Sequence, residues 1–219
     1  MKKINLPLAI SSAVGVLAIL FNMLLVGVMQ IVDSFSDGGY IHVSMSLTSM
    51  DTFLGVSCLI FLVLALFSKN NKHSNVITMG VLVIGIVMAF CTFIEYISLG
   101  KIYGYSAVDA NIAMWVFFTI ALLIFLVQTI VGLKFKKASI IFSIIGAVFG
   151  FVCIICSVCA MNFSLIRYML EYGDYNGVGL IFSNIIGVIM LLTFICSMLF
   201  MALSKQKDDG IKEIQLEQN

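Results

Sequence analysis

The sequence predicts an all-α protein, a polytopic bundle of six transmembrane helices with both termini in the cytoplasm. Of its 219 residues, 62% are hydrophobic and 11% are charged, whereas ordinary soluble domains carry about a quarter charged residues. The charged residues are segregated, which leaves six long stretches without any. Lysine and arginine gather in alternate connecting segments, and this bias sets helix orientation in a membrane.

Each uncharged stretch predicts one span. A helix needs about 20 mostly apolar residues to cross a hydrocarbon core about 30 Å thick, and these stretches lack the alternation of β-barrel strands. The second stretch is marginal and becomes long enough if its span begins near Met50. The predicted spans are about 7–32, 50–67, 75–99, 110–133, 138–161 and 178–203, with a polar cytoplasmic tail at 205–219.

Local signals support these elements in order. The first stretch far exceeds the roughly 7 to 15 apolar residues of a signal peptide core, so it is expected to remain as a span. The second and fourth spans each follow a capping pattern, TSMD at 48–51 and SAVD at 106–109, which assigns Asp51 and Asp109 to helix N-termini. The fifth is expected to continue as a helix beyond the membrane, where Arg167 and Glu171 stand four residues apart.

The basic residues fix the predicted orientation. Ten of the twelve lie on the side of the N-terminus, and only Lys101 and Arg167 lie on the other. Seven of the eleven acidic residues fall on or near that other side. We therefore predict a multi-pass protein of the cytoplasmic (plasma) membrane, whose partners are the lipid bilayer and another membrane protein or further copies of itself, with no role for nucleic acid.

Aromatic side chains gather on the predicted outer side. All seven tyrosines and Trp115 map to outer loops or outer helix ends. They could form the aromatic belt that favours the headgroup zone. A cluster on one side only could instead recognise a cationic or amphipathic ligand, or a partner protein.

Glu95 is a carboxylate within a predicted span to which no capping pattern gives a role. It lies about one turn from the predicted outer end of the third span. It could reach water, pair with Arg167 or Lys101, or line an outward-facing ligand site. Arg167, the only arginine, could equally pair with Glu171 within its own helix. The candidate ligand- or partner-binding residues are Glu95, Tyr96, Tyr103, Tyr105, Arg167, Tyr168 and Glu171.

Neither the cysteines nor the histidines predict a metal site or a cofactor. All six cysteines fall inside spans, and CIICSVC at 153–159 contains two overlapping C-x-x-C patterns. Their neighbours are apolar, which favours small apolar filler over a quinone-linked thiol relay. His42 and His73 lie in loops on opposite sides of the membrane, so they are not expected to share a metal.

Small residues predict helix contacts. Ala9 and Ala13, Ser11 and Gly15, and Gly146 and Gly150 each stand four residues apart, which lets helices approach closely. The few polar residues inside the spans are interpreted as hydrogen-bonding contacts between helices rather than a conduction path. These residues are Asn22, Thr92, Gln128, Asn184 and Thr193.

Three classes of function follow. An enzyme is not expected, because the sequence has no nucleophile with a base, no metal cluster and no glycine-rich phosphate loop. In size, topology and its small-residue first helix, the chain resembles the substrate-binding membrane components of vitamin importers. That resemblance implies a subunit that retains a solute and needs an ATPase. The class we favour is a non-enzymatic accessory protein that recognises a ligand or protein at its outer face.

The topology predicts a labelling pattern. In a variant without native cysteines, Asn71→Cys in the link at 68–75 should resist a membrane-impermeant maleimide until the cells are permeabilised. Tyr105→Cys should react in intact cells. Labelling of Asn71→Cys from outside would contradict the predicted orientation.

Overall fold

Every regular element that the structure describes is an α-helix. The computed structural model describes residues 5–35, 49–67, 71–103, 107–172 and 185–203. The labelled helices are α1 (Leu6–Phe35), α2 (Ser49–Phe67), α3 (Asn71–Tyr103), α4 (Ala107–Val131) and α5 (Lys136–Tyr172). A sixth, which we call the last helix, covers Ile185–Leu203. All six are long and apolar enough to cross a membrane, which confirms the all-α class and the six apolar helices.

The helix ends follow local sequence signals. Asn5 caps α1, because its Oδ1 accepts a hydrogen bond from the backbone N–H of Leu8 at 3.4 Å. Pro7 lies in the first turn of α1, where its missing N–H costs no hydrogen bond. Between α4 and α5 the chain turns tightly, and the N–H of Phe135 donates to the carbonyl of Val131 at 2.8 Å. These two helices therefore form an antiparallel hairpin.

Two helices exceed the spans predicted for them by at least two turns. α3 contains 33 residues and α5 contains 37. At 1.5 Å per residue they measure about 50 Å and 55 Å, well beyond a hydrocarbon core of about 30 Å. The continuation of α5 to Tyr172 confirms the helical extension that the spacing of Arg167 and Glu171 predicted. The capping pattern of the fourth span starts at Ser106, which lies outside the described residues.

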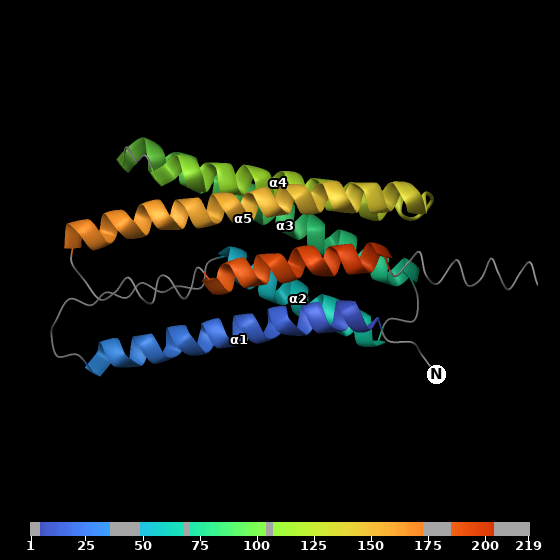
Figure 1. Ribbon diagram of the computed structural model, residues 1–219, viewed down its shortest axis with the longest axis horizontal. Helices are drawn as coiled ribbons and strands as arrows, with labels where there is room; N and C mark the ends of the chain where they lie inside the picture. The colour runs from blue at the N-terminus through green and yellow to red at the C-terminus, as the bar shows by residue number, and fades with distance from the viewer. Residues whose placement is uncertain (1–4, 36–48, 68–70, 104–106, 173–184, 204–219) are drawn as a thin grey trace, which may run out of the picture.

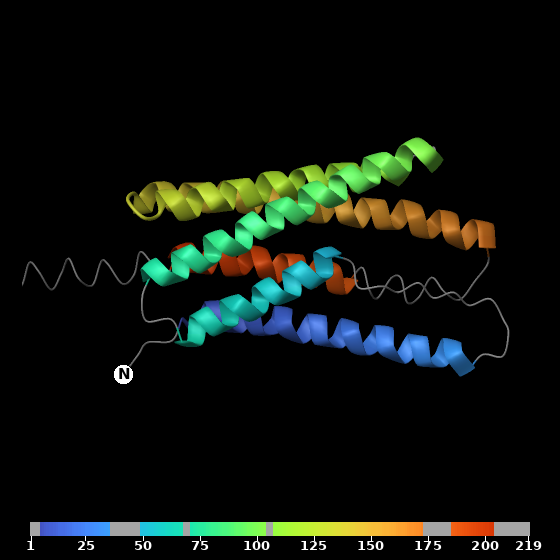
Figure 2. The same ribbon diagram turned by 180° about the vertical axis from the view of Figure 1, so that it is seen from behind.

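Successive helices run in opposite directions (Figures 1 and 2). α1, α3 and α5 finish at the end of the bundle where α2, α4 and the last helix begin. We call this the predicted outer end, and the opposite end the predicted cytoplasmic end. The first turn of α1 and the final turn of the last helix both lie at the predicted cytoplasmic end.

The last helix occupies the centre of the bundle. In Figures 1 and 2 it lies between α1 and α2 on one side and α4 and α5 on the other. Its contacts reach all five other helices. They are Ser197 with Ser11 and Ser12 of α1, Thr193 with Cys58 of α2, Met201 with Thr78 of α3, Phe194 with Phe125 of α4, and Ile195 with Gly150 of α5.

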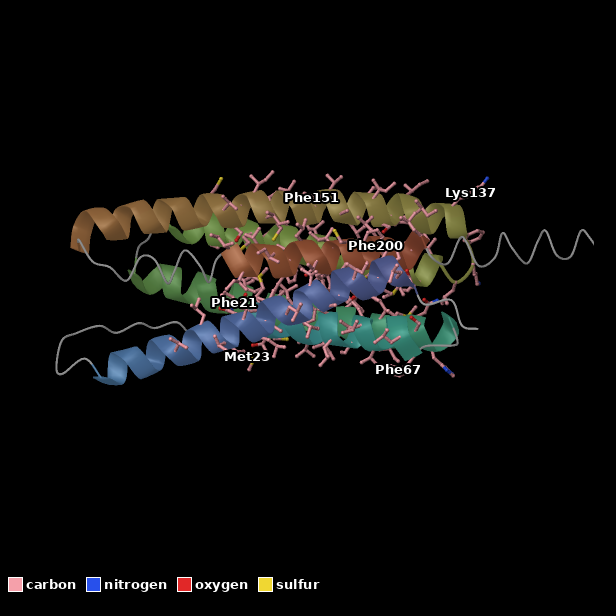
Figure 3. All side chains as sticks on the ribbon, turned by 60° about the horizontal axis from the view of Figure 1, so that its bottom comes forward. Phe21, Met23, Phe67, Lys137, Phe151 and Phe200 are labelled. Carbon is pink, nitrogen blue, oxygen red and sulfur yellow. The ribbon has the colours of Figure 1, made fainter. Side chains whose placement is uncertain are left out.

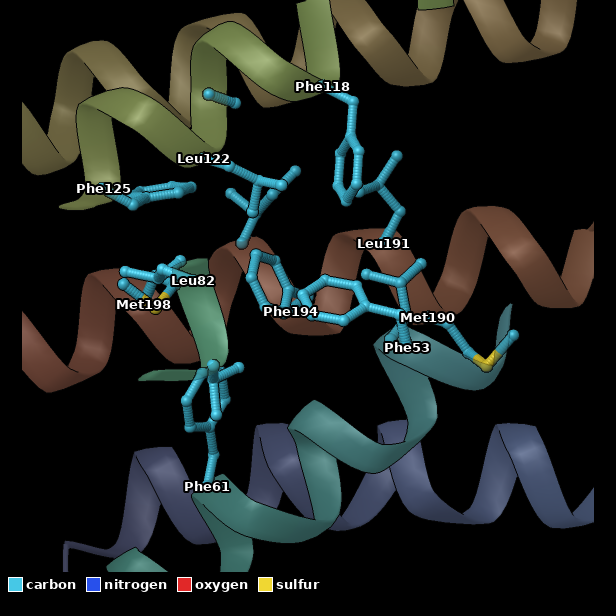
Figure 4. Packing of buried hydrophobic residues seen from close by; sticks show 14 of the residues in the cluster. Phe53, Phe61, Leu82, Phe118, Leu122, Phe125, Met190, Leu191, Phe194 and Met198 are labelled. Atoms are coloured by element: carbon cyan, nitrogen blue, oxygen red, sulfur yellow. The ribbon is translucent and has the colours of Figure 1, made fainter. Parts of the chain in front are cut away.

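Aromatic rings fill the middle of the bundle around Phe194 (Figure 4). The ring of Phe194 lies 5.9 Å from that of Phe53, 5.8 Å from Phe61 and 6.4 Å from Phe125, measured between centroids. Phe53 also meets Phe118 edge-on at 6.3 Å, which joins α2 to α4. Such tilted and edge-on pairs are favourable ring geometries, so this cluster fastens three helices together.

Glycines receive bulky side chains from neighbouring helices. A Cβ at Gly150 would lie 2.6 Å from Cδ1 of Ile195, and one at Gly146 would lie 2.8 Å from Cε1 of Phe125. A Cβ at Gly15 would collide with Cys58 and would lie 2.8 Å from Oγ1 of Thr193. These three predicted packing positions act as notches for side chains rather than as sites of backbone-to-backbone contact. The two alanines of the set differ, since Ala9 is buried and Ala13 is half-buried.

Apolar side chains project outward along the bundle (Figure 3). Phe21, Met23, Phe67 and Phe151 are all exposed, with Phe67 reaching 72%. A soluble protein rarely exposes so continuous an apolar surface, whereas lipid tails solvate one well. The surface therefore agrees with the spans identified from helix length and composition.

Removing the central ring should weaken the bundle. Phe194→Ala is expected to lower the free energy of unfolding by about 3 kcal/mol, because it empties a packed site between α2, α4 and the last helix. Titration with a denaturing detergent, followed by the fluorescence of Trp115, the only tryptophan, would measure the loss. Phe90→Ala is the matched control, since Phe90 is 57% exposed and should cost less than 1 kcal/mol. Equal losses for the two variants would contradict the central role of Phe194.

Candidate functional site

The residues predicted to form a site belong to two helices that finish at the same end of the bundle. Glu95, Tyr96 and Tyr103 belong to α3, and Arg167, Tyr168 and Glu171 belong to α5. Both helices finish at the predicted outer end (Figure 2). Tyr105 lies outside the described residues, and the side chains of the other six lie outside the described part of the structure. Whether Glu95 pairs with Arg167 therefore stays a prediction.

Two polar side chains are buried deeper in the bundle, with Asn22 lying 13 residues, or about 20 Å, before the end of α1. Asn22 of α1 has no exposed surface, and Asp51 in the first turn of α2 is only 7% exposed. The sequence predicted that Asp51 would lie in the headgroup region as part of a helix cap. Asp51 does lie in the first turn of α2, as the capping pattern predicted, and its depth relative to the headgroups stays a prediction. Its carboxylate is buried within the bundle, and a Cβ on Gly187 of the last helix would lie 3.3 Å from its Oδ1. Glycine at 187 leaves room for this carboxylate.

The packing brings Asn22 and Asp51 to one depth. Ile19 of α1 contacts Gly55 of α2, since a Cβ on Gly55 would lie 2.8 Å from Cβ of Ile19. From that contact toward the predicted outer end, Asn22 is three residues farther along α1 and Asp51 is four residues back along α2. With 1.5 Å per residue the two Cα atoms differ in depth by about 1.5 Å. We call Asn22 and Asp51 the outer polar pair.

The direction of Asn22 follows from the helix period. Positions 15, 19 and 22 follow one stripe of α1, because residues three, four and seven apart share a helix face. Gly15 on this stripe meets Cys58 of α2 and Thr193 of the last helix. Asn22, two turns farther on, therefore points between the same two helices. Its complete burial agrees with that position.

Asn22 does not make the hydrogen bond between helices that was predicted for it. Neither Oδ1 nor Nδ2 of Asn22 has a hydrogen-bond partner in the described structure. An unsatisfied buried polar group costs on the order of 1–3 kcal/mol, and the amide of Asn22 contains two. The sequence alone did not reveal this feature, because any asparagine within an apolar stretch suggests a bonded contact between helices.

Trp115 contributes another buried polar atom near the predicted outer end. Its Nε1 has no acceptor within the described ranges, and the side chain is 5% exposed. The ring packs edge-on against Phe118 at 5.9 Å. The aromatic-belt interpretation is therefore wrong for Trp115, because a belt residue faces lipid headgroups while this ring faces the protein core.

Hydroxyl groups form a second polar region toward the predicted cytoplasmic end. Oγ of Ser197 lies 2.9 Å from Oγ of Ser11 and 3.2 Å from Oγ of Ser12. Ser197 also donates to the carbonyl of Thr193 in its own helix at 2.7 Å, as helical serines do when water is excluded. We call Ser11, Ser12 and Ser197 the serine cluster. It provides the interhelical hydrogen bonding that was predicted at other positions.

The other predicted polar contacts have separate outcomes. Thr193 lies 3.7 Å from the thiol of Cys58, a contact between the last helix and α2. Thr92 donates to the carbonyl of Met88 within its own helix. Oε1 of Gln128 is buried and has no partner among the described residues. Asn184 lies outside the described residues.

All six cysteines are free thiols. Within the C-x-x-C stretch, Cys153 is buried and its thiol donates to the carbonyl of Met114 at 3.4 Å. Cys156 is half-buried and Cys159 is exposed, so the three thiols experience different surroundings. Within the described ranges no three His, Cys, Asp or Glu side chains group in a way that could hold a metal ion.

These features define a class, a helical bundle with six helices suited to span a membrane, two separated polar regions and a ring-filled middle. No protein-family model, curated protein or solved structure matches this chain.

The serine cluster should show measurable coupling. In a double-mutant cycle, Ser12→Ala and Ser197→Ala are expected to couple by about 0.6 kcal/mol, the mean for hydrogen bonds between membrane helices. Denaturing-detergent titrations of the four proteins would measure it. Thr129→Ala serves as the control partner for Ser197→Ala, because the Thr129 hydroxyl donates to Phe125 within its own helix. Coupling in the control cycle as large as in the serine cycle would contradict a specific contact.

Proposed function

We propose that the chain is a non-enzymatic multi-spanning protein of the cytoplasmic membrane that binds another membrane protein through its outer face. Both chain termini face the cytoplasm in this proposal. The binding surface comprises Glu95, Tyr96 and Tyr103 of α3 with Arg167, Tyr168 and Glu171 of α5, and Tyr105 after α3. A cluster of phenol rings and opposite charges suits protein recognition, where tyrosine and arginine are enriched.

One observation supports this proposal most. The middle of the bundle is filled by buried rings around Phe194, whose exposure is 1%, and by Met190, which has no exposed surface. A carrier needs a site for its solute or ion near the middle of the bilayer, usually where helices break. The described helices continue through this depth without a break. Function is therefore more reasonably assigned to an end of the bundle than to its middle.

The arrangement of the helices supports the choice of end. α3 and α5 are the longest labelled helices, and both finish at the predicted outer end. Helices that outlast the hydrocarbon core present their final turns to the headgroups and to water. Side chains on those turns can meet a partner without the cost of entering lipid.

A capture experiment in the host cell tests the proposal. The tagged full-length chain would be cross-linked, purified in mild detergent and studied by quantitative mass spectrometry of proteins and small molecules. A stoichiometric membrane-protein partner is expected. The triple variant Glu95→Gln, Tyr103→Ala and Arg167→Ala should reduce its recovery at least tenfold, because it removes two of the three charges and one of the phenol rings.

A matched variant controls for indirect effects. Three exposed polar residues lie where α3 begins and where α4 turns into α5, at the predicted cytoplasmic end; they are His73, Lys134 and Lys137. Changing all three to alanine should leave partner recovery unchanged. Undiminished recovery with the outer triple variant would show that the assigned surface is wrong. Loss of the partner only with the cytoplasmic triple variant would place binding at the opposite end.

A second candidate is the substrate-binding membrane subunit of a small-solute transporter. The observation that favours it is the outer polar pair. Asp51 contributes a buried carboxylate, and Asn22 contributes a buried amide whose polar atoms have no partner among the described residues. Such a subunit should purify with a solute bound and with an ATPase. In the same capture experiment, a retained small molecule without a stoichiometric membrane-protein partner would favour this candidate and contradict the accessory role.

A further inference from the structure

We propose that the outer polar pair, Asn22 and Asp51, binds a compact monovalent cation between α1, α2 and the last helix. The ligand is either an alkali ion or the ammonium group of a small amine. This site is separate from the surface assigned to partner binding, and it does not depend on that function.

Asn22 provides the main reason. A ligand that satisfies its Oδ1 would remove a cost on the order of 1–3 kcal/mol that the bundle otherwise carries. The side chain has no exposed surface, and its polar atoms have no partner in the described structure. The helix period places it on the face of α1 that meets α2 and the last helix at Gly15. Buried polar groups in native proteins are overwhelmingly hydrogen-bonded to protein, water or a ligand.

Asp51 sets the charge of the ligand. One enclosed carboxylate at the same depth as Asn22 favours a single positive charge, because an opposite charge offsets the cost of holding a carboxylate away from water. Asp51 takes part in an interaction of its own in the structure, so a cation would add to its contacts rather than supply the first one. Oxygen atoms of carboxylates and amides are the usual ligands of hard cations, and they also accept hydrogen bonds from ammonium groups.

The last helix limits the size of the ligand. Gly187 lies at nearly the same depth as Asn22. The contact between Gly15 and Thr193 aligns the last helix with α1. From that contact, Asn22 lies seven residues farther along α1, and Gly187 lies six residues back along the last helix. These steps correspond to about 10.5 Å and 9 Å of helix. A Cβ at position 187 would lie 3.3 Å from Oδ1 of Asp51, so the site that we propose suits a compact group.

The test uses the full-length chain purified in an uncharged mild detergent. Its thermal unfolding would be compared in sodium chloride, methylammonium chloride and choline chloride at one ionic strength, with Trp115 fluorescence as the readout. Choline is the reference, because it is bulky and its quaternary nitrogen donates no hydrogen bond. At ten times the dissociation constant, a bound cation should raise the Tm by about 3–5 °C relative to choline. A rise with sodium alone identifies an alkali-ion site, and a rise with methylammonium alone identifies an ammonium site.

Matched variants test whether the rise in Tm depends on the outer polar pair. Asn22→Leu and Asp51→Asn should each abolish the rise in Tm, since each removes an oxygen ligand or the charge. Gln128→Leu should retain it, because Gln128 is a buried amide whose Oε1 has no partner among the described residues and which lies in the last turn of α4, at the predicted cytoplasmic end. If Asp51→Asn does not fold, Asn22→Leu decides, since this change keeps the shape of the side chain and removes no charge.

Two results would overturn the proposal. The salts would be tested up to about 0.5 M each. Equal Tm values of the native chain in all three would mean that Asn22 is hydrated rather than bound to a cation. A rise that persists in Asn22→Leu would mean that any cation binds elsewhere. Both results concern the purified chain alone, so they leave the partner-capture outcome untouched and the two proposals fail separately.

Discussion

Inside a bilayer the hydrophobic effect does not hold helices together, because lipid tails are as apolar as leucine. Close packing around the last helix takes over that role in this bundle. Phe194 and Ile195 extend from it in different directions, toward the rings of α2 and α4 and toward the notch at Gly150 of α5. Dispersion contacts of this kind are individually weak and depend steeply on distance, so a methyl group at a notch would force the side chain that fills it to shift.

Packing of this kind also determines where polar groups can lie. The interior has hydroxyl contacts at the serine cluster and the amide and carboxylate of the outer polar pair, with apolar rings between them. Most buried hydroxyls donate to carbonyls of their own helix, as Ser57 does to Phe53 at 2.7 Å. The serines therefore cost little, whereas Asn22 cannot satisfy its amide in the same way. That contrast distinguishes a structural polar contact from a candidate ligand site.

The two proposals assign different tasks to one end of the bundle. The final turns of α3 and α5 offer charged and phenolic side chains to a partner, while the outer polar pair lies deeper, between α1, α2 and the last helix. Because α1 does not take part in the proposed partner surface, changes at Asn22 test cation binding without removing that surface.

The sequence by itself determined the all-α class and six apolar helices, since backbone groups in lipid must be satisfied within each helix and only long apolar stretches permit that. It also located the notches at Gly15, Gly146 and Gly150, although not the side chains that fill them. Tertiary structure alone decided that the last helix is central, that Trp115 faces inward, and that Asn22 and Asp51 lie at nearly the same depth in the bundle. The physical reason is that hydropathy reports the solvent around a helix, whereas these features depend on the rotation and register of one helix against others far away in sequence.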